Sequence, residues 1–149
     1  MKSKQVLSID QMKHLRELGL NTSDASMYWA RVSHGSRVDD KSKGKWFLSL
    51  QKEFQVCGFM SYESIPTYTL QDILDKLPPI IEEVYWLTLE AMDKQKNEWN
   101  IKYACIISEH ECASFRSENL IDAAYEMFCW CVENGYIGKE GEICRTKFF

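Results

Sequence analysis

The pattern of apolar and polar residues predicts three helices, and the first is expected to begin after Ser8. Ser8 and Gln11 have the spacing of a capping box. The apolar residues Leu7 and Met12 have the spacing of a hydrophobic staple around the same start. Gly19 is well placed to end this helix, because glycine readily adopts the left-handed conformation found after helix ends.

A second helix is predicted from Thr69 to Leu77. Thr69 and Asp72 have capping-box spacing, and a pair of prolines, residues 78–79, stops the helix because proline lacks an amide donor. Four apolar side chains at helical spacing define one buried face; they are Leu70, Ile73, Leu74 and Leu77.

The third predicted helix, residues 118–134, is expected to be the most deeply buried. Ser117 is its expected N-cap and Gly135 its expected stop. Its polar residues fall in one narrow stripe, and almost everything else is apolar; the stripe contains Asn119, Asp122, Glu126, Cys129 and Glu133. Such a helix lies at the centre of a domain or presents part of its surface to a partner.

Period-two patterns between the helices predict antiparallel strands. Residues 27–32 and 46–50 are expected to pair across a long loop, and residues 84–91 and 99–107 to form a second hairpin. Residues 51–65 fit either a strand or an irregular packed segment. The last predicted strand places five side chains on one face, namely Trp99, Ile101, Tyr103, Cys105 and Ile107. The expected fold is α+β, with an antiparallel sheet of about three to five strands packed with the helices.

Length and composition are those of one ordinary domain. The chain has 149 residues, which predicts a single domain over residues 1–149, with a polar tail at 138–149 that is expected to be only partly ordered. The net charge of −4 argues against a general affinity for nucleic acid. There is no apolar run of membrane-spanning length and no signal-peptide pattern at the N-terminus, so a cytoplasmic protein without a membrane partner is expected. The six cysteines form no CxxC pair and are expected to be reduced and mostly buried.

Candidate chemistry is sparse, and no motif predicts a metal or an organic cofactor. His110 and Cys112 are the only candidates for a catalytic thiol with a nearby base, but nothing supplies the remaining parts of such a site. A zinc site would need further ligand pairs that the sequence lacks. The favoured interpretation is that this segment is a turn after the second hairpin and that Cys112 is a loop residue.

One loop combines basic and aromatic residues. It carries Lys41, Lys43, Lys45 and Trp46, a combination that in other proteins binds single-stranded nucleic acid by phosphate contacts and stacking. Two aspartates, residues 39–40, precede it directly, and its composition is also that of an ordinary solvated loop.

Several segments resemble a family. "YTLQDILDKLP" at 68–78, "NLIDAAYEM" at 119–127 and "ENGYI" at 133–137 occur here in this order, after the opening "IDQMKHLRELGLNTSDASM". The chain is similar in these segments to small proteins without assigned function that are carried by phages and mobile elements of gut bacteria. The resemblance implies an intracellular accessory protein and supplies no catalytic residues.

The expected function is therefore a non-enzymatic accessory or protein-binding module, whose partner is another protein or a second copy of the chain. Two alternatives stay open. One is a small enzyme with a site near His110 and Cys112, and the other is a nucleic-acid binder that uses the loop at 41–46.

Overall fold

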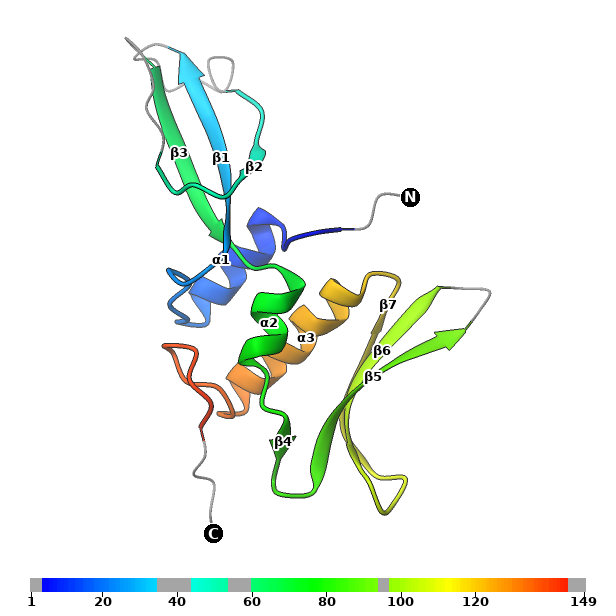
Figure 1. Ribbon diagram of the computed structural model, residues 1–149. Helices are drawn as coiled ribbons and strands as arrows, with labels where there is room; N and C mark the ends of the chain where they lie inside the picture. The colour runs from blue at the N-terminus through cyan, green and yellow to red at the C-terminus, as the bar shows by residue number, and fades with distance from the viewer. Residues whose placement is uncertain (1–3, 35–43, 54–59, 94–96, 145–149) are drawn as a thin grey trace.

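The computed structural model describes residues 4–34, 44–53, 60–93 and 97–144. These residues form three helices and two antiparallel sheets, which confirms the predicted α+β class (Figure 1). The helices are α1 (Ile9–Glu17), α2 (Leu70–Lys76) and α3 (Leu120–Glu133). Along the described part of the chain, three strands lie between α1 and α2, and four strands lie between α2 and α3.

Both predicted capping boxes are present. The Ser8 hydroxyl accepts the Gln11 backbone N–H at 3.1 Å, and the Gln11 side chain accepts the Ser8 N–H at 2.9 Å. Thr69 and Asp72 make the same reciprocal pair at the start of α2, at 3.1 and 3.0 Å. Gly19 after α1 has φ +89°, the left-handed conformation predicted for it.

The smaller sheet has three strands in the order β2-β1-β3. They are β1 (Met27–His34), β2 (Phe47–Ser49) and β3 (Met60–Thr67). The predicted pairing of β1 with β2 is confirmed, with Trp29 opposite Leu48. Within the ambiguous segment 51–65, residues 60–65 belong to β3, whereas residues 54–59 lie outside the described residues. Figure 1 shows this sheet extending away from the helices.

The larger sheet has four strands in the order β4-β5-β6-β7. They are β4 (Ile80–Ile81), β5 (Tyr85–Asp93), β6 (Glu98–Cys105) and β7 (Glu111–Ser117). The predicted hairpin of β5 and β6 is confirmed, although β6 ends at Cys105 and not at Ile107. The strands thus divide between two sheets where the sequence suggested one, because β3 leads directly into α2 and β4 begins new pairing beyond that helix.

The start of α3 differs from the prediction. Its N-cap is Asn119, whose side chain makes no capping hydrogen bond, while Ser117 is the last residue of β7. The Ser117 hydroxyl accepts the Asn119 N–H at 3.2 Å, so it closes the turn into the helix without capping it. Gly135 ends the helix with φ +76°, as predicted.

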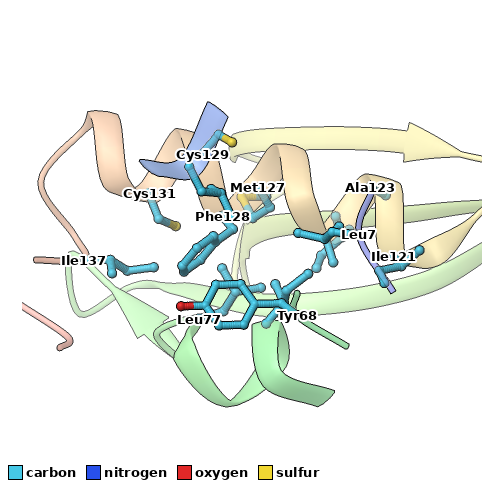
Figure 2. Packing of buried hydrophobic residues seen from close by; sticks show 14 of the residues in the cluster. Leu7, Tyr68, Leu77, Ile121, Ala123, Met127, Phe128, Cys129, Cys131 and Ile137 are labelled. Carbon is cyan, nitrogen blue, oxygen red and sulfur yellow. The ribbon is translucent and has the colours of Figure 1, made fainter. Parts of the chain in front are cut away.

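Helix α3 is the most buried helix and packs against β6, β7 and α2. Figure 2 shows Phe128 of this helix pointing toward Tyr68 in the core, with Cys131 near Ile137. The polar stripe is narrower than predicted. Cys129 is buried, and the Asp122 carboxylate accepts hydrogen bonds from the Lys4 ammonium at 2.6 Å and the Gln11 amide at 2.9 Å. These bonds fasten α1 and the segment before it to α3.

The segment after α3 returns to the body of the protein. Ile137 pairs with Ile143, and the Asn21 N–H donates to the Lys139 carbonyl at 2.7 Å. Residues 145–149 of the tail lie outside the described residues. Among the helices in the described part of the chain, none has the length and apolarity needed to cross a membrane.

Candidate functional site

The two residues of the predicted thiol site lie in different elements. His110 lies in the turn between β6 and β7, where its carbonyl accepts the Cys105 N–H at 2.9 Å. Cys112 lies inside β7, so the expectation of a loop at this position is wrong. The register shifts between Tyr103 and Ala104, which marks a bulge where residues 111 and 112 stand opposite Ala104. No hydrogen bond joins the His110 imidazole to the Cys112 thiol in the described residues.

The surroundings of Cys112 favour the neutral thiol. Partial burial and the nearby Glu82 carboxylate raise the pKa of Cys112 above its ordinary value. A nucleophilic cysteine needs the opposite shift, which a neighbouring cation or a helix N-terminus supplies. The arrangement therefore offers no activated thiolate at this position.

A second thiol, Cys131, is buried beside the Tyr103 hydroxyl. The sulfur lies 3.8 Å from Tyr103 Oη, and that hydroxyl donates to the Pro78 carbonyl at 2.7 Å. Burial raises the pKa of Cys131 to about 12. Across the described part of the chain, no group of three histidine, cysteine or carboxylate side chains is placed to hold a metal ion.

The thiols should differ in reactivity. The Ser108 hydroxyl and the backbone near Ile107 lower the pKa of Cys105, whereas burial raises the pKa of Cys112. A lower pKa gives more thiolate at pH 7.5, so we expect iodoacetamide to alkylate Cys105 before Cys112. Peptide mass spectrometry over time measures this order. Ser108→Ala should slow the Cys105 reaction, and faster labelling of Cys112 would contradict the assignment.

The predicted basic loop is described only in part. Lys41 and Lys43 lie outside the described residues, and Lys45 is exposed. The Arg31 guanidinium lies over the Trp46 ring, 4.3 Å from its centroid, and Arg31 also pairs with Glu63 at 3.1 Å. One face of the Trp46 indole is therefore covered from within the protein. Nucleic-acid binding through this loop stays a prediction.

Two turns lie at the same end of the four-stranded sheet. Residues 82–84 connect β4 to β5, and residues 106–110 connect β6 to β7. Tyr85 pairs with Cys105, and the Cys105–His110 hydrogen bond closes the second turn, so the two turns lie on adjacent strands. Figure 1 shows both turns at the same end of the sheet.

Apolar side chains are exposed at this end. Ile107 is 93% exposed and Ile106 68%, and Trp86 on β5 is 45% exposed beside its cross-strand neighbour Ile80. We call this group the apolar tip; it consists of Ile80, Val84, Trp86, Ile106 and Ile107. Single exposed apolar residues are ordinary, but neighbouring ones on a monomer mark interaction sites.

The first of the two turns has an unusual backbone. Glu82 and Glu83 have φ values of 51° and 64°, in the left-handed region that disfavours residues other than glycine and asparagine. The Val84 N–H donates to the Ile81 carbonyl at 3.3 Å across the turn. The Tyr136 hydroxyl donates to the Glu82 carboxylate at 2.6 Å and fixes that side chain.

The sequence prediction missed the apolar tip. It placed Ile107 on the same face as Ile101 and Tyr103, which are fully buried. The alternation continues through Ile107, but β6 ends two residues earlier. One signal in the sequence could have predicted this turn. Four polar residues, 108–111, directly follow the consecutive residues Ile106 and Ile107, and a polar run of this kind is typical of a turn.

Comparisons with known protein families, curated proteins and solved structures found no match to this chain.

Proposed function

We propose that this chain is a non-enzymatic protein-binding module that contacts its partner through the apolar tip. The observation that carries the proposal is the exposure of Ile106 and Ile107 in the β6–β7 turn and of Val84 in the β4–β5 turn. These two turns begin beside each other, since Tyr85 pairs with Cys105. Covering apolar surface gains about 25 cal/mol per Å². A partner with a matching pocket would therefore be held mainly by these side chains.

The raised pKa of Cys112 gives no support to the alternative of a small enzyme at that residue. The phage or mobile-element setting stays a prediction. A second copy of the chain is the alternative occupant of the tip, and light scattering on the purified protein distinguishes it from a different partner.

The test is selection of a phage-displayed library of random peptides on the immobilised protein. Peptides that bind are then measured by fluorescence anisotropy against two variants. Ile107→Ser should weaken binding about tenfold or more, because burying an isoleucine side chain gains about 1.5–3 kcal/mol and 1.4 kcal/mol is a factor of ten.

Leu50→Ser is the matched control, because Leu50 is 76% exposed and follows β2 in the other sheet. Its affinity should stay within about twofold of the parent value. The proposal would be contradicted if no peptide were enriched, or if Ile107→Ser and Leu50→Ser lowered the peptide affinity equally.

A further inference from the structure

Acidic residues lie in the same two turns as Val84, Ile106 and Ile107 of the apolar tip. Glu82 and Glu83 lie in the β4–β5 turn and Glu109 in the β6–β7 turn, and all three are exposed. We call these three residues the acidic rim. Neither residues 77–92 nor residues 103–115 contain a lysine or an arginine. The two hairpin segments that build the tip therefore bring negative charge without positive charge of their own.

The rim differs from the acids farther along the same sheet. Glu90 and Glu111 both contact the Lys102 ammonium, at 3.0 and 3.3 Å, and Asn100 donates to Glu90 at 3.1 Å. Those two carboxylates share the positive charge of one ammonium within the sheet. Within the described part of the chain, Glu82 is the one rim residue whose side chain makes a hydrogen bond, and the Tyr136 hydroxyl that donates to it is neutral.

A partner that covers the tip must come close to these carboxylates. Removing a carboxylate from water without a compensating charge is unfavourable, and like charges across an interface repel. Lysine and arginine side chains around an apolar pocket would satisfy both requirements. They would also increase the association rate by electrostatic attraction.

We infer that the apolar tip binds a basic protein partner, in which the apolar side chains that cover the tip are bordered by lysine or arginine side chains. This inference rests on the proposed function and specifies the chemistry of the partner. It also disfavours an anionic lipid surface, because that surface carries the same sign of charge as the rim.

The test uses the peptides enriched in the library selection, together with a version of each in which lysine and arginine are replaced by glutamate. We expect enriched peptides to combine apolar and basic residues. Their glutamate versions should bind at least tenfold more weakly. Association rates measured by stopped flow should fall as NaCl rises from about 50 to 500 mM, since salt screens exposed charges.

The test variant carries two substitutions in the acidic rim, Glu83→Lys and Glu109→Lys. The control variant carries two substitutions at exposed positions of α3, Glu126→Lys and Glu133→Lys. Both pairs change the net charge equally. The first should slow peptide association about tenfold and the second less than twofold. Unfolding temperatures of both proteins verify that each is folded.

The outcomes separate the two proposals. Peptides that are neutral or acidic, yet need Ile107, would overturn the inference and leave the proposed function standing. Peptides that do not need Ile107 would overturn both. Sedimentation with phosphatidylcholine vesicles that depends on Ile107 would also overturn the inference, because it would identify a bilayer as the surface that the tip contacts.

Discussion

Phe128→Ala is expected to lower the free energy of unfolding by about 3–5 kcal/mol. Phe128 is fully buried on α3, and its ring meets the ring of Tyr68 edge-on with centroids 6.1 Å apart (Figure 2). Alanine would remove the apolar contacts and leave a cavity between α3 and the start of α2. Urea denaturation followed by circular dichroism measures the change.

Phe47→Ala is the matched control for this prediction. Phe47 lies at the start of β2 and is 45% exposed, so the same truncation should cost less than about 1 kcal/mol. Similar losses for the two variants would mean that α3 does not form the centre of the core.

Tyr103→Phe is expected to destabilise the protein by about 1–3 kcal/mol. The Tyr103 hydroxyl is buried and donates to the Pro78 carbonyl at 2.7 Å. Phenylalanine keeps the ring but leaves that buried carbonyl without its donor. This hydrogen bond ties the end of α2 to the centre of the four-stranded sheet, so its loss should be measurable by thermal unfolding.

Tyr28→Phe provides the comparison, because the Tyr28 hydroxyl makes no hydrogen bond to the described residues. It should change the free energy of unfolding by less than about 0.5 kcal/mol. If Tyr103→Phe were equally harmless, the Pro78 carbonyl would have to find another donor, such as water.

The helices could be predicted because their signals are local. Ser8 with Gln11 and Thr69 with Asp72 set the starts of α1 and α2 through contacts three residues apart. The predicted N-cap of α3, Ser117, is wrong because this residue is the last one of β7. Its backbone conformation is set by pairing with Trp99 on β6. That partner is distant in sequence, so local capping preference could not reveal it.

Two strands escaped prediction for different reasons: β4 has only two residues, and β7 has few apolar residues. In β7, Ala113 and Phe115 face the core while Ser114 and Arg116 face the other way, and this alternation is too short to predict a strand. The division into two sheets depends on which strands pair across α2, and apolar periodicity does not encode pairing. The same limit applies to the apolar tip, since the end of β6 is set by its neighbours.

The sequence analysis selected His110 and Cys112 because a thiol and an imidazole can act together in catalysis. The structure shows no hydrogen bond between these two side chains. The apolar tip contains no catalytic residue type, and only burial distinguishes Ile107 from Ile101. A surface of this kind becomes visible once the three-dimensional position of each turn is known.

The left-handed backbone of Glu82 and Glu83 has a thermodynamic consequence for binding. Glycine would adopt this conformation more easily, by about 1–2 kcal/mol per residue. Folding has already restricted the turn, and Tyr136 holds the Glu82 side chain in the free protein. Any molecule that contacts these carboxylates meets a preorganised turn, and the association loses little conformational entropy there.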